Sequence, residues 1–104
     1  MNEAAPGFSD EQLAKARAGD AAALESLIRA HQSSVYSLAL RMLGTPELAE
    51  DLTQDVFMQL NGKLKTMGSN THLTFWLRKV TTHRAIDQLR RRSRFDWHSK
   101  PLSP

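Results

Sequence analysis

Helix-like spacing of the apolar residues is the feature that most constrains the fold of this chain. Apolar side chains recur three and four positions apart along most of its length, and signals for strands are nearly absent. The segments are bounded by residues typical of helix ends. Ser9 and Gln12 have the spacing of a capping box, Asp20 can cap a second helix, and Gly19 and Gly44 can end the first two. The sequence therefore predicts an all-α fold.

The predicted architecture is a compact bundle of three main helices plus a short N-terminal helix. The four predicted helices run between Ser9 and Gly19, between Asp20 and Gly44, from Thr45 to about Gly62, and from about His72 to Arg92. Lys63 to Thr71 is predicted to form a loop, because glycine, serine and asparagine favour turns. We expect a flexible N-terminus at residues 1–9, one helical domain at 10–94, and the start of a linker or a cut end at 95–104.

Residue content and motifs argue against an enzyme, a metal site and a membrane span. The chain has no cysteine, and its four histidines lack the spacing of a zinc motif. It has neither a glycine-rich phosphate loop nor a G-x-S-x-G elbow, so we predict no cofactor and no small-molecule substrate. No apolar run approaches the roughly 18 residues of a membrane span, and the N-terminus does not resemble a signal peptide. We therefore expect a soluble cytoplasmic protein.

Charge is distributed unevenly along the chain. Residues 1–59 carry four basic and nine acidic side chains, a balance of −5, whereas residues 60–104 carry ten basic and two acidic ones, a balance of +8. The basic end is a plausible surface for a polyanion, and the acidic end would repel one. The pattern indicates a separate partner for each end.

A polar stripe on the predicted third helix has several possible functions. Leu52, Val56 and Leu60 form an apolar row that a core explains, and a neighbouring face carries Asp51, Gln54, Asp55 and Met58. The stripe could be solvated surface, a docking face, an acid/base pair or half a metal site. Nothing in the sequence indicates a cleft for an acid/base pair. The residues alone leave a solvated face and a docking face open.

The predicted fourth helix combines a core stripe with a cationic line. Leu73, Leu77 and Val80 form the core stripe, and the other side carries His72, Lys79, His83 and Arg90. A cationic line with aromatic neighbours suits nucleic acid, although basic runs are also found as solvated faces. Trp76 lies beside the core stripe, and a tryptophan in such a position is usually buried. Phe75 lies off the stripe and is predicted either to pack against another helix or to be exposed.

Two motifs, in this order and spacing, resemble those of a known family. The pattern D-x-x-Q-[DE]-x-F is present as Asp51, Gln54, Asp55 and Phe57, and W-L-x-[RK]-[IV] is present as Trp76, Leu77, Lys79 and Val80. Residues 10–94 resemble the region 2 domain of bacterial sigma factors of the extracytoplasmic-function type, also called group IV. The resemblance implies a helical domain that takes part in transcription initiation and is not itself an enzyme.

The resemblance also implies two binding surfaces. The third helix would dock on the clamp helices of the largest subunit of core RNA polymerase, through Asp51, Gln54, Asp55, Phe57, Met58 and Asn61. The loop and the fourth helix would melt the promoter −10 element and capture a flipped base of the non-template strand. The residues implied for DNA binding are Lys63, Met67, Ser69, Asn70, Thr71, Trp76, Lys79, His83, Arg90 and Arg91. An anti-sigma factor is a further implied partner, covering the same surfaces.

Three positions depart from the family pattern. Met67 stands where the loop usually has phenylalanine, Asn70 replaces an acidic residue, and His83 replaces an asparagine. These positions affect which −10 base would be captured. Sigma factors of this type also have a second helical domain for the −35 element. We therefore expect this chain to be one domain of a longer protein, and a stand-alone relative of region 2 is the alternative.

Two other interpretations remain. The first is a helical protein-interaction module whose basic end is solvated. The second is a helix-turn-helix regulator of double-stranded DNA, against which the long connection before the fourth helix counts.

Overall fold

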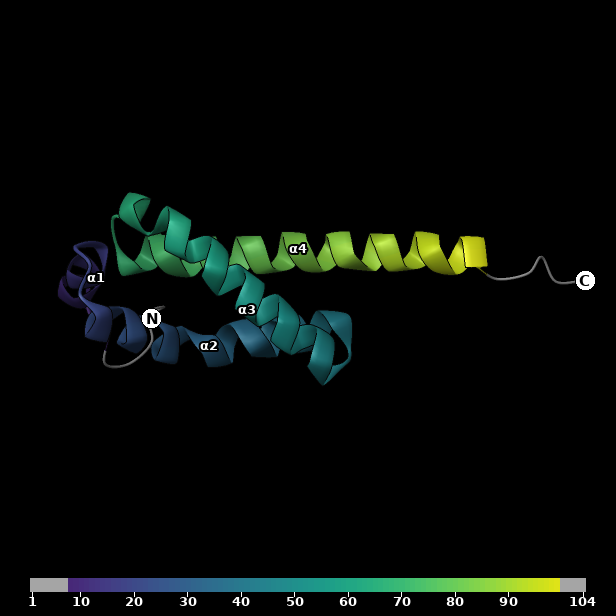
Figure 1. The fold of residues 1–104 in the computed structure, drawn as a ribbon, viewed down its shortest axis with the longest axis horizontal. Helices are drawn as coiled ribbons and strands as arrows, with labels where there is room; N and C mark the ends of the chain where they lie inside the picture. The colour runs from purple at the N-terminus through teal and green to yellow at the C-terminus, as the bar shows by residue number, and fades with distance from the viewer. Residues whose placement is uncertain (1–7, 100–104) are drawn as a thin grey trace, which may run out of the picture.

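The chain folds into four α-helices and one short 3₁₀ turn. The computed structural model describes the backbone of residues 8–99 and the side chains of residues 8–93. Its elements are α1 (Asp10–Arg17), α2 (Ala21–Leu43), α3 (Pro46–Lys63), η1 (Leu64–Thr66) and α4 (Asn70–Ser99), shown in Figure 1. The predicted all-α bundle of three main helices and a short leading one is therefore confirmed. Among the described residues, no helix contains an apolar stretch of the length that a membrane span requires.

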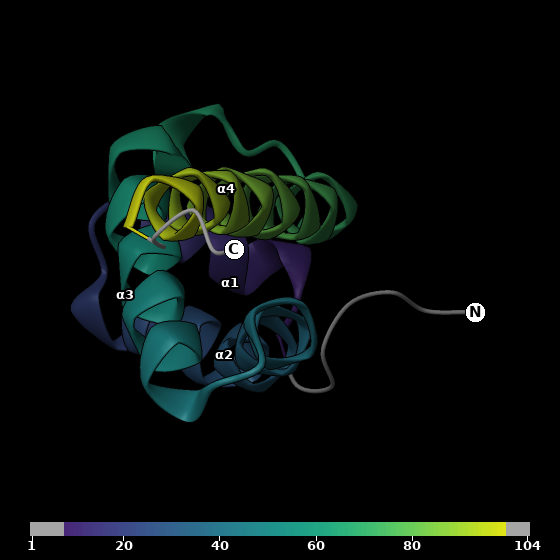
Figure 2. The ribbon, with the colours of Figure 1, turned by 90° about the vertical axis from the view of Figure 1, so that its right-hand side faces the viewer.

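Helix α2 is the centre of the bundle, because it packs against α1, α3 and α4. In the end-on view of Figure 2, α2, α3 and α4 surround a shared interior, and α1 lies behind them. Figure 1 shows that α1 lies at one end of the molecule, whereas the last turns of α4 extend past α2 and α3 at the other end.

The predicted helix ends of α1 and α2 are confirmed. The Ser9 N–H donates to Gln12 Oε1 at 3.0 Å, and the Gln12 N–H donates to Ser9 Oγ at 3.2 Å, which completes the capping box. Asp20 Oδ1 accepts from the Ala23 N–H at 3.1 Å. Gly44 ends α2 in the left-handed region with a φ of 83°, where a side chain would add strain.

The start of α3 matches the prediction in position but not in bonding. Thr45 occupies the N-cap position with extended backbone angles, and Pro46 follows in the first turn. The Thr45 hydroxyl makes no capping hydrogen bond and has no hydrogen-bond partner in the described structure. The fixed φ of Pro46 suits the first helical position, so helix initiation here relies on the proline rather than on the threonine side chain.

Both ends of α4 differ from the prediction. The helix begins at Asn70 instead of about His72, because Ser69 is the N-cap: its Oγ accepts from the His72 N–H at 3.1 Å. The helix ends at Ser99 instead of Arg92. No glycine or proline stands between Arg92 and Pro101 to stop it. Residues 95–99 are thus helical rather than irregular, and residues 100–104 lie outside the described part.

The core is an apolar interior shared by all the helices. The predicted row Leu52, Val56 and Leu60 is buried, as are Leu73 and Leu77. His31, near the middle of α2, is one of the buried polar residues. Its Nδ1 donates to the Leu27 carbonyl at 3.0 Å, and its ring meets Phe8 edge-on at 5.8 Å between centroids. Thr81 is also buried, and its hydroxyl donates to the Leu77 carbonyl at 2.6 Å. These buried polar groups therefore bond within their own helices.

Candidate functional site

The residues expected to bind polymerase lie on α3, and most of them face solvent. Asp51, Gln54, Asp55 and Asn61 are exposed, and Met58 is 73% exposed. Phe57 differs, because its side chain is partly buried against the core. One helix therefore presents carboxylate, amide and thioether groups on a rigid support, which suits docking better than a loop does.

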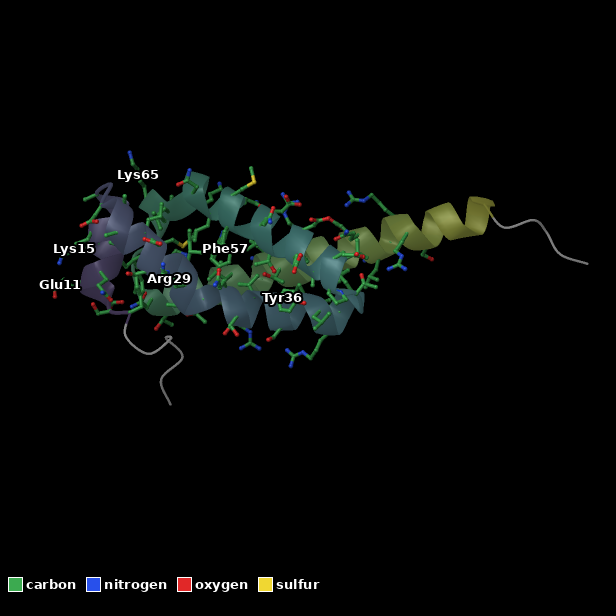
Figure 3. The ribbon with its side chains drawn as sticks, turned by 60° about the horizontal axis from the view of Figure 1, so that its bottom comes forward. Glu11, Lys15, Arg29, Tyr36, Phe57 and Lys65 are labelled. Carbon is green, nitrogen blue, oxygen red and sulfur yellow. The ribbon has the colours of Figure 1, made fainter. Side chains whose placement is uncertain are left out.

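Two hollows adjoin this surface, and Gln54 lines both. The first lies between α2 and α3 and is lined by Gln32, Ser33, Tyr36, Glu50, Thr53 and Gln54. The second is more apolar and is lined by Leu24, Ile28, Gln54, Phe57, Met58, Leu60 and Asn61. Figure 3 labels one residue of each hollow: Tyr36 lines the first, and Phe57 lines the second. The α3 surface is thus grooved on both sides of Gln54, so side chains of a partner helix can enter it.

The carboxylates of α3 have no cationic partner in the described side chains. Within residues 8–93 the one ion pair joins Arg29 and Glu25 of α2, at 2.8 Å. The exposed acidic residues of α3 are Glu47, Glu50, Asp51 and Asp55. Because no internal cation neutralises these carboxylates, they can attract cationic side chains of another protein.

The loop before α4 is anchored by the N-terminal segment, and two of its predicted site residues are buried. Met67 is 1% exposed and Asn70 is 5% exposed. The Asn70 N–H donates to Asp10 Oδ1 at 2.8 Å, and its side-chain nitrogen donates to the Phe8 carbonyl at 3.0 Å. Arg17 donates to the Met67 carbonyl. In this structure the Met67 side chain fills the core and the Asn70 side chain bonds to the backbone near α1, so their assignment to DNA binding stays a prediction.

The other loop residues are more accessible. Lys63 and Thr71 are exposed, whereas Ser69 is half-buried and its hydroxyl already caps α4. Lys65 of η1 is also exposed and projects outward in Figure 3, although the sequence analysis did not single it out. The feature of the sequence that could have identified Lys65 is its positive charge within the segment that was predicted to form a loop. The exposed side chains of residues 63–71 are thus two lysines, Lys63 and Lys65, and two threonines, Thr66 and Thr71.

On α4, the cationic residues are exposed and the tryptophan belongs to the core. Lys79, His83, Arg90 and Arg91 face solvent. Trp76 is partly buried and packs against the core cluster, so its ring is not a free stacking surface. The predicted cationic line is therefore accessible along α4 without Trp76.

Phe75, in contrast, is 64% exposed and has polar neighbours. It lines a hollow with Arg78, Lys79, Thr82 and His83. The sequence placed Phe75 off the core stripe but did not assign it to a site.

A further hollow lies between α2 and α4. It is lined by Ser33, Ser34, Ser37, Leu38, Arg41, Thr74 and Arg78. Arg78 is common to this hollow and to the one around Phe75. The sequence could not reveal that Arg41 and Arg78 line the same hollow, because this depends on how two distant helices pack.

The connection from α3 to α4 bears on the helix-turn-helix alternative. Residues 64–69 separate the two helices and include the 3₁₀ turn η1. The turn of a helix-turn-helix motif usually has three or four residues. The longer connection thus argues against a helix-turn-helix regulator and favours the sigma factor domain or the protein-interaction module.

In the described residues no group of three or more histidine or carboxylate side chains is placed to hold a metal ion.

Comparison with known proteins places these elements in one family. The model of the family described as Sigma-70 region 2 matches residues 27–95, which include most of α2, all of α3 and η1, and most of α4. The chain is 37% identical over 86 residues to the ECF RNA polymerase sigma factor SigE of Mycolicibacterium smegmatis, covering 80% of this chain and 33% of that protein. It is 26% identical over 82 residues to the ECF RNA polymerase sigma factor SigW of Bacillus subtilis, covering 79% and 44% respectively.

This chain therefore spans about a third to less than half of these two relatives. No solved structure gave a significant match. The family match covers both surface patterns, the polar stripe of α3 and the cationic line of α4. This chain belongs to the sigma-70 region 2 family and is a region 2 domain of the extracytoplasmic-function type.

Proposed function

We propose that this domain binds core RNA polymerase through α3 and the promoter −10 element through the loop and α4, and so serves transcription initiation. One observation carries the proposal. Within the region that the family model matches, the acidic and amide groups of α3 and the cationic groups of α4 are exposed on different helices. Two partners of opposite charge can therefore be bound at the same time.

The polymerase contact would be polar at its centre and apolar at its side. Asp51, Gln54 and Asp55 offer acceptors to cationic side chains of the clamp helices. Phe57 and Met58 line the apolar hollow beside them, where an aliphatic side chain of the partner would be desolvated. The polar groups would orient the partner helix, and burial of an aliphatic side chain in the apolar hollow would add affinity.

The DNA contact would use the accessible cations rather than the buried loop residues. Lys63, Lys79, His83, Arg90 and Arg91 are exposed and can neutralise phosphates. Met67 and Asn70 would support the loop from inside, and Thr71 would face the captured base. Unstacking a base costs a few kcal/mol, so a loop that is already anchored avoids adding its own ordering cost.

The domain would contribute binding and leave the chemistry of RNA synthesis to the polymerase. It would act in the cytoplasm, where the polymerase works. An anti-sigma factor would inhibit it by covering the α3 and α4 surfaces.

Capture of core RNA polymerase, or of its clamp-helix fragment, tests the protein-binding half. The double variant Asp51→Ala/Gln54→Ala removes two exposed groups from α3. We expect about tenfold weaker capture or more, because each lost charge-assisted hydrogen bond is worth about 1.5–3 kcal/mol. The matched control is Glu11→Ala, which removes an exposed carboxylate from α1 at the far end of the molecule in Figure 3.

The double variant must keep its helical circular dichroism signal, since neither residue belongs to the core. Unchanged capture by a folded double variant would contradict docking through α3. Equal losses in the double variant and in Glu11→Ala would indicate a general charge effect and would also contradict it.

A further inference from the structure

The apolar hollow beside α3 contains the most exposed methionine of the described residues. Met58 is 73% exposed, whereas Met67 is 1% exposed and Met42 is partly buried against the core. Leu24 and Ile28 of α2 line the same hollow as Met58. The Met58 thioether is therefore open to reagents in solution and also forms part of an apolar surface.

We propose that Met58 is an oxidation site, at which a hydroperoxide forms methionine sulfoxide, and that this modification weakens the binding of core RNA polymerase to α3. The inference rests on the proposed function and adds regulation to its polymerase-binding surface. The chain has no cysteine, so its methionines are the sulfur atoms that a peroxide can oxidise.

The oxidation itself needs access to the sulfur and no catalytic residue. A lone pair of the sulfur attacks one oxygen of the hydroperoxide, so that an S–O bond forms as the O–O bond breaks. The sulfur is oxidised, and the peroxide is reduced to an alcohol or, from hydrogen peroxide, to water, as the proton of the attacked oxygen passes to the departing one. Because the reagent must reach the sulfur, exposure selects Met58 over Met42 and Met67.

The apolar character of the hollow is the first reason why oxidation would weaken docking. A thioether is polarisable and packs well in irregular apolar gaps, whereas a sulfoxide is polar. When a partner helix covers the hollow, the sulfoxide oxygen loses its water near Leu24 and Ile28. Removing a polar group from water without a new hydrogen bond is unfavourable, so the oxidised surface binds less tightly.

The two amide side chains of the hollow give the second reason. Gln54 and Asn61 stand at i−4 and i+3 from Met58, so they lie on the same side of α3, and both are exposed. Their amide N–H groups can donate to a sulfoxide oxygen, which accepts more strongly than a thioether sulfur does. A hydrogen bond from Gln54 to the modified side chain would withdraw this amide from the proposed polymerase contact.

Mass spectrometry and polymerase titration test the proposal together. The complete chain is treated with hydrogen peroxide, the peroxide is removed, and peptide masses report sulfoxide at each methionine. We expect sulfoxide to form at Met58 before Met42 and Met67. The treated chain should bind core RNA polymerase about tenfold more weakly, because burial of an apolar methionine side chain accounts for about that much affinity. Methionine sulfoxide reductases, with dithiothreitol as the reductant, should restore binding.

Matched variants assign the effect to one sulfur, each compared with its own untreated sample. Met58→Leu keeps an apolar side chain but forms no sulfoxide, so it should bind polymerase equally before and after peroxide. Met42→Leu should lose as much binding on treatment as the wild type does. Met58→Gln places a polar group in the hollow and should bind as weakly, without peroxide, as the oxidised wild type. Bound polymerase should also protect Met58 from peroxide relative to Met42.

Oxidation of Met58 should act on one partner alone. Because Met58 lies on α3, binding of a single-stranded oligonucleotide of the −10 element through α4 should not decline in the treated chain. The thermal transition should also be unaltered, since the side chain is exposed. Equal losses for polymerase and oligonucleotide would indicate damage to the fold and would contradict the proposal.

The other outcomes separate this inference from the function on which it rests. If Met58 is oxidised no faster than Met42, or if the oxidised chain binds polymerase as tightly as the untreated one, the oxidation site is wrong while docking through α3 stands. An equal loss in treated Met58→Leu would assign the effect to another methionine and would also reject it. If the untreated chain does not bind polymerase, both the polymerase half of the proposed function and this site are rejected.

Discussion

The surface that α2 forms with α3 and the one that it forms with α4 differ in chemistry although they share a helix. The first contains Gln54 between two hollows, with exposed carboxylates along α3. The second contains Arg78 between two hollows and is lined by no carboxylate. Helix α2 packs against both helices, so its buried residues stabilise both surfaces. Its exposed residues line the hollows of both, and Ser33 is common to the two.

This difference is what the proposed binding of two partners of opposite charge requires. The acidic and basic halves of the sequence pack around the same core. Their exposed charged side chains form separate surfaces because they lie on different helices. Substitutions on one surface should affect one partner, and substitutions in the shared core should affect both. The following predictions test this division.

The largest effect is expected from Leu27→Ala in the core of α2. Leu27 is fully buried, so truncation leaves a cavity and should lower the free energy of unfolding by about 2–5 kcal/mol. Urea unfolding measured by circular dichroism gives this value. Binding of both polymerase and oligonucleotide should decline together. Ser26→Ala, at an exposed position of the same helix, is the control and should change stability by less than about 0.5 kcal/mol. A stable Leu27→Ala variant that loses one partner alone would contradict the shared core.

A smaller and selective effect is expected from Lys79→Glu on α4. Reversing this exposed charge should weaken oligonucleotide binding about tenfold at low salt, and the loss should shrink as salt rises. Capture of the clamp-helix fragment should not change. Lys15→Glu makes the same charge change on α1 and is the control. Similar losses for the two variants would mean that net charge, and not the α4 surface, governs binding.

Asp10→Ala tests the anchoring of the loop at the junction of α1 and α4. The variant removes the acceptor for the Asn70 N–H at the start of α4, which should cost about 1 kcal/mol of stability. Hydrogen exchange at residues 70–73 should accelerate. Asp10→Asn keeps an acceptor oxygen and should lose less, and Glu11→Ala removes a neighbouring carboxylate that makes no such bond. Unchanged exchange in Asp10→Ala would show that the loop is held by its other contacts.

The smallest effect is expected from Arg84→Ala, which removes the 2.7 Å hydrogen bond to Gln59 between α4 and α3. Because this bond is exposed, its loss should cost less than about 0.5 kcal/mol and should leave both binding activities intact. A double-mutant cycle with Gln59→Ala measures the coupling. A coupling above about 1 kcal/mol would mean that the α3 and α4 surfaces are energetically linked through this contact.

Local signals in the sequence were enough to predict most of the fold. The capping box at Ser9, the cap at Asp20 and the stop at Gly44 act within a few residues, so they can be recognised without tertiary information. The buried row of α3 follows from helical spacing in the same way. The prediction ended α4 too early, at Arg92 instead of Ser99. The segment after Arg92 is charged and lacks glycine and proline before Pro101, and the helix propensities of such residues do not determine where a helix ends.

Long-range packing explains what the sequence could not predict about the site. Met67 and Asn70 belong to a segment that resembles a surface loop, yet contacts with Phe8, Asp10 and Arg17 turn both residues inward. The presence of Arg41 and Arg78 in one hollow likewise depends on how α2 and α4 pack. The exposure of the α3 stripe, in contrast, followed from its spacing beside the apolar row.

The bonds from α1 to the loop have a consequence for how this domain can vary. The family model matches from residue 27 onward, whereas Asp10 and Arg17, which anchor the loop, precede that point. The shape of the loop is thus encoded in two separate stretches of the chain. Exchanging the loop between relatives would transfer its side chains but not the frame that orients them. A chimera should therefore inherit the donor's loop geometry when α1 is exchanged with it.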